Sequence, residues 1–194
     1  MASRMAVRHR STKETDIEIR LDVDGTGRTD VSTGVPFFDH MLSQLGRHGG
    51  LDLDVRAKGD LEVDAHHTVE DTGIVLGDAL AEALGDKAGV RRFASVLLPL
   101  DEALIQVALD LSGRPYLVYE VETAPERIGT FDPQLAEEFF RAFVTTAGIT
   151  LHLRSLSGRN GHHVLEACFK GVARALRDAV RVEGTGIPST KDLL

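Results

Sequence analysis

The chain of 194 residues has no tryptophan, a single cysteine and only 5% aromatic residues. One cysteine excludes an internal disulfide and agrees with a reducing compartment. So few aromatic side chains offer no stacking platform for single-stranded nucleic acid. No apolar run approaches the roughly 20 residues that cross a bilayer, and the polar N-terminus lacks the apolar segment of a signal peptide. These absences predict a cytoplasmic protein with no membrane partner.

Lysine and arginine, 22 in total, are also fewer than aspartate and glutamate, 30 in total. The formal net charge is −8, which argues against a nucleic-acid surface because such surfaces normally carry an excess of lysine and arginine. Hydrophobic residues make up 42% of the chain and charged residues 27%, close to the average of soluble globular domains. The chain therefore has enough apolar material for a core, and each of its cations is a candidate for a specific role.

The sequence repeats itself in order. The segment LDV at residues 21–23 matches LDL at 109–111, an interval of 88 residues, and HHTVEDTGIVLGDAL at 66–80 matches HHVLEACFKGVARAL at 162–176, an interval of 96. At the first interval Glu14 corresponds to Glu102. Matching stretches in the same order indicate an internal duplication, with residues 1–95 as the first half-repeat and 96–194 as the second half-repeat with a C-terminal tail, together one compact unit.

Each half predicts the order β-β-α-β-α. Apolar and polar residues alternate in the strands expected near residues 16–25 and 103–113, and again at 51–59 and 149–158. Helices are expected at about 36–49, 66–84, 132–148 and 162–182, several of them beginning near proline and ending at glycine. Amphipathic helices and half-apolar strands predict an α+β protein in which mixed sheets are covered by helices on one face.

Two histidine pairs each stand three residues before a glutamate, in DAHHTVED (64–71) and NGHHVLEA (160–167). Adjacent residues on a helix diverge by about 100°, so each helix presents two imidazoles in different directions with a carboxylate between them. Such divergent ligands serve two metal ions better than one. Imidazole and carboxylate suit Mn, Fe or Zn, whereas the absence of cysteine ligands argues against a structural zinc site. One such pair is commonly a surface feature, but two at equivalent positions predict a metal centre.

Other histidines carry different expectations. His40, on the preceding helix, adds to the metal set, and Glu138 holds the matching place in the second half. His152 alternates within a strand and is expected to be structural. His9 is expected in a flexible tail.

Eight stretches of the chain resemble the imidazoleglycerol-phosphate dehydratase family of histidine biosynthesis. They are TKET (12–15), GVPFFDHML (34–42), QLGRHG (44–49), DAHHTVEDTGIVLG (64–77), PLDEAL (99–104), DLSGRPYL (110–117), GRNGHHVLEACFKGVARAL (158–176) and PSTK (188–191). The resemblance implies a duplicated fold in a homo-oligomeric shell of 24 subunits, with sites between subunits and two Mn²⁺ ions per site.

The resemblance also assigns residues. The implied metal ligands are His40, His66, His67, Glu70, Glu138, His162, His163 and Glu166. One position departs from the family, which usually has histidine where this chain has Glu138. Glutamate still suits a hard ion such as manganese, and His152 is the fallback ligand.

The same resemblance implies contacts to a phosphorylated imidazole substrate. They are Glu14, Gln44, Arg92, Arg114, Lys170, Ser189, Thr190 and Lys191. Arginine binds phosphate through two parallel hydrogen bonds and lysine as a point charge. Alone, each cation would be an ordinary surface charge, and Lys170 could be only the i, i+4 partner of Glu166. The tail GTGIPSTKDLL (184–194) is expected either to be disordered or to close over the phosphate.

The implied reaction dehydrates D-erythro-imidazole glycerol phosphate to imidazole acetol phosphate. The proton that leaves carbon has no neighbouring carbonyl to acidify it, so simple base catalysis is poor. Two metals that hold the ring as its anion would let the adjacent hydroxyl leave, through a diazafulvene-like intermediate. Glu14 is the favoured acid–base residue, with Glu166 and His67 as further catalytic candidates.

Two other functions use the same histidine pairs. A two-metal phosphatase would release inorganic phosphate, and a non-catalytic metal-binding shell would form no ketone. The arginines and the PSTK segment favour the lyase over both.

Overall fold

A computed structural model describes residues 4–123 and 126–194, in which each half contributes four strands and two helices. The first half contains β1 (Met5–Ser11), β2 (Thr15–Asp22), β3 (Thr29–Ser32), α1 (Pro36–Gly49), β4 (Asp52–Gly59) and α2 (His66–Leu84). The second contains β5 (Phe93–Leu100), β6 (Ala103–Asp110), β7 (Tyr116–Glu120), α3 (Leu135–Ala147), β8 (Thr150–Ser157) and α4 (Gly161–Ala179). Both sequence motifs with paired histidines therefore open a 19-residue helix.

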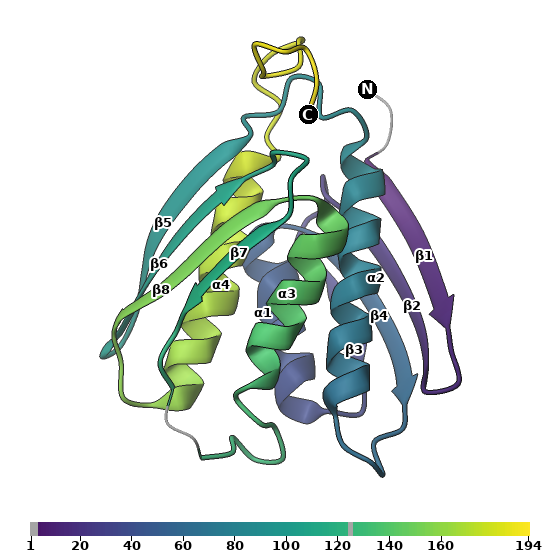
Figure 1. Ribbon diagram of the computed structural model, residues 1–194, viewed down its shortest axis with the longest axis vertical. Coiled ribbons are helices and arrows are strands. Elements are labelled where there is room, and N and C mark those ends of the chain that lie inside the picture. The colour runs from purple at the N-terminus through teal and green to yellow at the C-terminus, as the bar shows by residue number, and fades with distance from the viewer. Residues whose placement is uncertain (1–3, 124–125) are drawn as a thin grey trace.

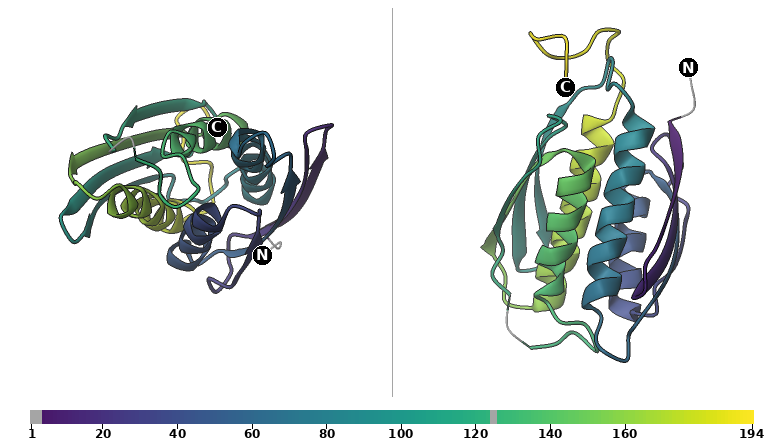
Figure 2. Two further views of the ribbon diagram at one scale, coloured as in Figure 1. Left: turned by 90° about the horizontal axis from the view of Figure 1, so that it is seen from below. Right: turned by 45° about the vertical axis from the view of Figure 1, so that its right-hand side comes forward.

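The two sheets have the same order, β1-β2-β4-β3 and β5-β6-β8-β7. In each, two antiparallel pairings are followed by one parallel pairing, so the sheets are mixed. The helices lie between the sheets, and each sheet turns its other face outward (Figures 1 and 2). The predicted α+β class with mixed sheets covered on one face is confirmed.

Each half also begins with a strand that the sequence patterns did not predict. β1 buries only Ala6 and pairs on one side, so its residues lack the apolar alternation of a half-buried strand. The expectation of a flexible tail at His9 is therefore wrong, since His9 pairs with Glu18 in β2. β5 is also an edge strand, which tolerates Pro99. The half boundary predicted at residues 95 and 96 falls inside β5, which lies wholly in the second sheet.

Helices from the two halves pack in crossed pairs, α1 with α4 and α2 with α3. One hydrophobic cluster spans both halves, with a centre rich in phenylalanine, including Phe38, Phe139 and Phe169. α2 approaches α3 closely, because a Cβ added at Gly77 would stand 2.0 Å from the hydroxyl oxygen of Thr146. This packing places the start of α1, which carries His40, beside the start of α4, which carries His162 and His163.

Candidate active site

His40, His162 and Glu166 converge between α1 and α4. His162 Nε2 lies 2.8 Å and His40 Nε2 3.3 Å from the same oxygen, Oε2 of Glu166. The three side chains have ligand atoms within 4.8 Å of one another, the one group of this kind in the described part of the chain. Two imidazole nitrogens and a carboxylate oxygen form a donor set that suits a divalent transition-metal ion.

Local sequence explains why the histidines lie at helix starts. The side chain of Asn160 accepts a hydrogen bond from the backbone N–H of His162 at 3.0 Å, and Asp64 does the same for His66 at 2.7 Å. Asn160 is the N-cap of α4, whereas Asp64 precedes Ala65, the N-cap of α2, and each side chain satisfies a backbone donor that has no partner in the first turn. The rings of His162 and His163 are 83° apart in plane, so the predicted divergence of adjacent imidazoles is observed.

Lys170 completes the surroundings of Glu166. Its Nζ lies 2.5 Å from Glu166 Oε1, one helical turn away. Burial alone would raise the pKa of Glu166, but hydrogen bonds from Lys170, His162 and His40 outweigh it and lower the pKa to about 2. Gln44 lies 3.5 Å from His40 Nδ1 on the outer side of the cluster. The Glu166 carboxylate is therefore ionised over the whole neutral range.

The second histidine of each pair contacts a different carboxylate. His163 Nδ1 lies 2.8 Å from Glu102 Oε2, and His67 Nδ1 lies 3.0 Å from Asp60 Oδ2. Glu14, the residue favoured for proton transfer, is 3.9 Å from His67 Nδ1. The hydrogen bond that His67 donates to Asp60 raises the pKa of His67, and the one that His163 donates to Glu102 raises the pKa of His163. Asp60 and Glu102 were not predicted as site residues, although the repeat alignment paired Glu102 with Glu14.

The corresponding cluster in the first half is looser. His66 Nε2 lies 3.7 Å from Glu70 Oε2 on α2. Glu138 is half-buried on α3 and does not join a group of three ligands in residues 4–123 and 126–194. His152 projects from β8 on the opposite face to the buried Leu151 and Leu153, away from the helices. The structure thus brings three of the eight predicted metal ligands together, and it leaves His66, Glu70 and Glu138 outside any such group in the described residues.

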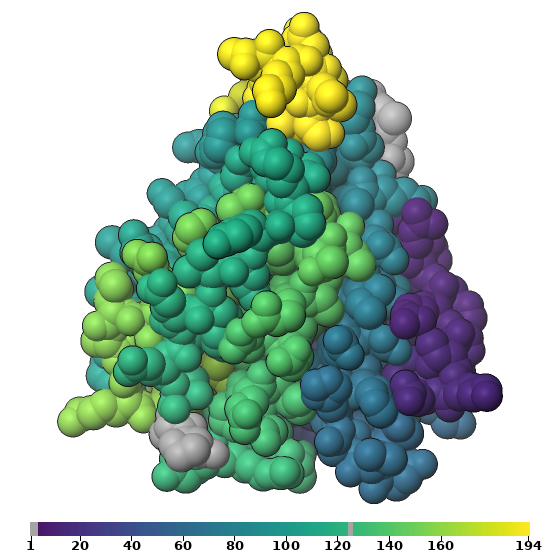
Figure 3. Space-filling view, viewed as in Figure 1, coloured from purple at the N-terminus to yellow at the C-terminus, as the bar shows by residue number. Residues whose placement is uncertain are grey.

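The predicted phosphate contacts gather at the other end of the molecule. A cavity of about 630 Å³ is lined by Arg92, Arg114, Ser189, Thr190 and Lys191 together with Pro188, Leu193 and Leu194 of the C-terminal tail. The tail, coloured yellow, projects from this end without helix or strand (Figures 1 and 3).

Arg92 is the most firmly held of these cations. Its Nε donates to Asp110 at 2.7 Å and its Nη1 donates to the carbonyl of Pro188 at 2.7 Å. Asp110 was not predicted as a site residue. Arg92 therefore ties the tail to β6 and still borders the cavity.

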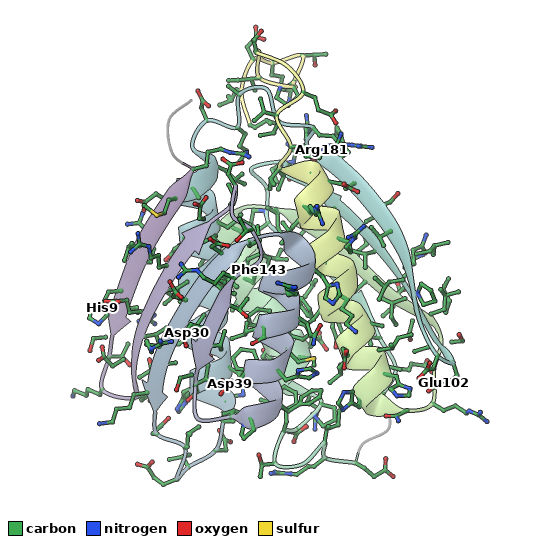
Figure 4. The ribbon with its side chains drawn as sticks, turned by 180° about the vertical axis from the view of Figure 1, so that it is seen from behind. His9, Asp30, Asp39, Glu102, Phe143 and Arg181 are labelled. Atoms are coloured by element: carbon green, nitrogen blue, oxygen red, sulfur yellow. The ribbon has the colours of Figure 1, made fainter. Side chains whose placement is uncertain are left out.

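The histidines and the cation-lined cavity are separated by the length of α4. The backbone N–H of Arg92 donates to the carbonyl of Ala179, the last residue of α4, whereas His162 is the second residue of that helix. From its first residue to its last, α4 makes 18 steps of about 1.5 Å, so the helix is roughly 27 Å long. In Figure 4, Glu102 marks the histidine end and Arg181 the opposite end.

Comparison with known proteins identifies the family. The family model of imidazoleglycerol-phosphate dehydratase matches residues 33–176, which contain both histidine pairs, helices α1, α2 and α3, and α4 except for its last turn. The chain belongs to the imidazoleglycerol-phosphate dehydratase family. The imidazoleglycerol-phosphate dehydratase of Acidothermus cellulolyticus is 59% identical over 98% of this chain and 93% of its own length. That of Roseobacter denitrificans is 61% identical over 95% of this chain and 96% of its own.

Solved structures of the family have the same fold. The Staphylococcus aureus dehydratase aligns with a TM-score of 0.84 and 39% identity, covering 92% of this chain and 99% of its own. The Pyrococcus furiosus dehydratase, solved in complex with (S)-C348, aligns with a TM-score of 0.84 and 37% identity, covering 96% and 100%.

Membership in the dehydratase family makes the chain a hydro-lyase that acts on imidazole glycerol phosphate in histidine biosynthesis. The family is metal-dependent, and the His40, His162 and Glu166 triad is a candidate metal site in this chain. Within the described residues, no helix is both long enough and apolar enough to span a bilayer.

Proposed function

We propose that the chain converts D-erythro-imidazole glycerol phosphate to imidazole acetol phosphate in the cytoplasm, in active sites that two or more copies of the chain build together. The observation that carries this proposal is the separation of the two predicted contact regions. The substrate joins its ring and its phosphate through three carbons, so it is far shorter than the roughly 27 Å of α4. One copy therefore supplies the histidines of a site and another supplies the arginines.

The proposed assembly is a homo-oligomer, with 24 subunits as the family resemblance implies. A closed symmetric arrangement gives every copy the same neighbours, so each histidine end meets a cation-lined cavity. Exposed apolar side chains on the outer sheet faces, including Phe93, Leu97 and Val7, are available for such contacts. Sedimentation at graded protein concentrations tests this point, because a catalytically active monomer would contradict shared sites.

Two manganese ions per site are proposed. The donor set fits, because His40, His162 and Glu166 already converge and Glu166 is fully ionised at neutral pH. His66, Glu70 and Glu138 are the proposed ligands of the second ion, with His67 and His163 as the remaining imidazole ligands. When bound, the ions would act as Lewis acids that hold the substrate's imidazole ring and favour loss of its ring proton.

The chain's own residues supply binding and proton transfer. Arg92, Arg114 and Lys191 bind the phosphate, while Ser189 and Thr190 donate hydrogen bonds to its oxygens. Lys170 holds Glu166 in place, and Gln44 borders the ring-binding triad. The tail that carries Lys191 would cover the phosphate and exclude water.

Glu14 is the proposed proton-transfer residue for the substrate carbons, and Glu166 and His67 are further candidates for this task. The hydroxyl next to the ring leaves with a proton as water, through a diazafulvene-like intermediate. The C–H on the following carbon is then acidic, and its loss gives an enol that rearranges to the ketone. The atoms balance, because one hydroxyl and one hydrogen leave and no oxidant is needed.

The decisive experiment incubates the manganese-loaded protein with imidazole glycerol phosphate and measures ketone and inorganic phosphate together. Ketone without phosphate release is expected. Phosphate release would indicate a two-metal phosphatase, and neither product would indicate a metal-binding shell, so both outcomes would overturn the proposal.

The second ion site has its own test at Glu138. If Glu138 is a ligand, Glu138→Ala lowers the retained manganese toward one ion per chain, whereas Glu138→His keeps both ions because histidine is the usual residue in the family. Metal analysis after gel filtration gives the stoichiometry. Two ions per chain in Glu138→Ala would remove Glu138 from the ligand set.

A further inference from the structure

In both halves, the second histidine of the pair makes its hydrogen bond through Nδ1, while the nearest carboxylate oxygen to His163 Nε2, Asp101 Oδ2, is 3.8 Å away, too far for a hydrogen bond. His163 Nδ1 lies 2.8 Å from Glu102 Oε2, and His67 Nδ1 lies 3.0 and 3.2 Å from the two carboxylate oxygens of Asp60. The first histidine differs, since His162 points Nε2 at Glu166. A carboxylate can only accept, so Nδ1 of His67 and His163 must carry the proton.

A protonated Nδ1 leaves the lone pair of Nε2 as the ligand atom. Metal-binding histidines generally donate their other ring N–H to a carboxylate, carbonyl or water, which fixes the ring orientation and makes the ligand more basic. Asp60 and Glu102 stand in this relation to His67 and His163. Both carboxylates lie outside the helix that carries the histidine, so they tie each helix start to the sheet connections.

Glu102 is itself fixed. Its Oε1 accepts hydrogen bonds from the backbone N–H groups of Asn160 at 2.8 Å and Arg159 at 3.2 Å, immediately before α4. The side chain is therefore held at one oxygen by the backbone and presents the other to His163. It is positioned to orient a ring, and both of its oxygens are already engaged in the protein.

In the first half, the carboxylate that contacts Nδ1 of the second histidine belongs to Asp60 and not to Glu14, the counterpart of Glu102. Glu14 precedes β2 as Glu102 precedes β6, yet Glu14 is 3.9 Å from His67 Nδ1 and Asp60 is closer. Asp60 follows β4 directly, whereas the residue that follows β8 is Gly158, which has no carboxylate. The side chain of Glu14 is 56% exposed, against 31% for Glu102 and 20% for Asp60.

We infer that Asp60 and Glu102 are positioning residues that orient His67 and His163 for metal binding through Nε2, and that Asp60 thereby leaves Glu14 free to transfer protons. This inference rests on the proposed dehydration. It goes beyond that proposal because it assigns different roles to the two carboxylates beside His67, those of Asp60 and Glu14. Asp60 acts on the affinity for manganese, and Glu14 acts on the substrate.

The test compares Asp60→Asn, Glu102→Gln and Glu14→Gln in the manganese-loaded protein. Each is challenged with graded concentrations of a chelator, and the retained manganese and the rate of ketone formation are measured. Loss of an orienting carboxylate is expected to weaken metal retention by about 10- to 100-fold. Activity of Asp60→Asn and Glu102→Gln should return when manganese is added in excess, because their proton-transfer residue is intact.

Glu14→Gln should behave in the opposite way, retaining manganese like the wild type and staying inactive in excess manganese. Glu62→Gln is the matched control, since it removes an exposed carboxylate two residues from Asp60. Circular dichroism identifies any variant that does not fold, and Asp60 and Glu102 test the idea independently in the two halves.

Wild-type metal retention in both Asp60→Asn and Glu102→Gln would overturn the positioning role. Failure of Asp60→Asn to recover in excess manganese would overturn the division between Asp60 and Glu14. Neither result would touch the proposed dehydration, which fails separately if the wild-type protein forms no ketone.

Discussion

The two halves of the molecule have the same sheet order but differ at both ends of their helices. At the histidine end, His162 lies 2.8 Å from Glu166, whereas its counterpart His66 lies 3.7 Å from Glu70. The histidine and the glutamate of the second motif are therefore within hydrogen-bonding distance of each other, whereas those of the first motif are not. Both halves keep the residue types that a metal needs, which suggests that metal binding was retained in each copy of the repeat.

At the opposite end of the molecule, the two halves differ in the surroundings of their arginine side chains. Arg92 and Arg114 line the cavity beneath the tail, while Arg28, the counterpart of Arg114, lies 4.0 Å from Asp52. Arg4, which precedes β1 as Arg92 precedes β5, donates to Asp24 at 2.9 Å. The larger cavity beside Arg4 also carries Asp24, Glu82, Asp86 and Glu183, so its charge is mixed. Each chain thus offers two candidate metal-binding clusters at its histidine end but one cation-lined cavity at the opposite end.

The largest expected effect comes from removing a first histidine in either half. His162→Ala and His66→Ala should each lower kcat at least about 100-fold and remove about one manganese ion per chain, because a Lewis acid contributes several kcal/mol to such a reaction. Steady-state kinetics and metal analysis measure both. His9→Ala, on the exposed β1, is the control and should keep full activity. If only one of the two variants loses activity, the two ends are not equivalent in catalysis.

Gly77→Ala should test whether α2 packs more closely on α3 than α4 packs on α1. The added Cβ would stand 2.5 Å from the carbonyl oxygen of Phe143, whereas the counterpart of Gly77 on α4 is already Ala173. Overpacking of this kind costs about 1–3 kcal/mol. We expect a thermal midpoint lowered by several degrees, with Gly184→Ala, where nothing lies within 4 Å, close to the wild type. An unchanged midpoint would show that the helices separate without strain.

Arg114→Ala should weaken substrate binding, and Arg28→Ala should not. A charge-assisted hydrogen bond contributes about 1.5–3 kcal/mol, so KM should rise by about 10- to 100-fold with a smaller change in kcat. Inorganic phosphate should inhibit the wild type competitively and Arg114→Ala weakly. Equal KM values for the two variants would mean that the phosphate does not use this cavity.

The smallest expected effect concerns the loop that Asp52 holds in the first half. Its Oδ1 accepts from the backbone N–H groups of Thr26 at 2.7 Å and Arg28 at 3.0 Å, and these bonds lower the pKa of Asp52. A lowered folded-state pKa stabilises the protein above the ordinary value near 4, and this contribution is lost as the pH falls through the folded-state pKa.

Asp52→Asn should therefore reduce the free energy of unfolding by about 1 kcal/mol at neutral pH, with the difference shrinking below pH 4 or so. Thermal unfolding at several pH values measures it. Thr150 occupies the matching position in β8 and carries no charge, so Thr150→Ser provides a pH-independent reference. A pH-independent loss in Asp52→Asn would point to packing and not to its charge.

The sequence was sufficient for the helices and for the strands with alternating burial. Ile17, Ile19 and Leu21 in β2 are buried at every second position, which is the signal that period-2 patterns detect. β1 was missed because it buries only Ala6, and β5 was missed because apolar residues on its outer face, Phe93 and Leu97, hide the alternation of the strand. Their pairing depends on neighbours that are distant in sequence.

The site was predictable to the extent that its residues recur in a motif. The HHxxE spacing and the repeat located the histidines, and the resemblance located Arg92 and the tail. Asp60 carries no such signal, because its contact with His67 depends on how the chain leaves β4. The separation of His162 from Arg92 was also not evident, since it follows from the direction of α4 between the two sheets.

The placement of His162 and Arg114 at opposite ends of the molecule has a genetic consequence. A cell with two defective gene copies, one encoding His162→Ala and the other Arg114→Ala, would make mixed assemblies. In some of their sites the intact histidines of one product would meet the intact arginine of the other. Such a cell would grow without added histidine although neither gene copy alone supports growth.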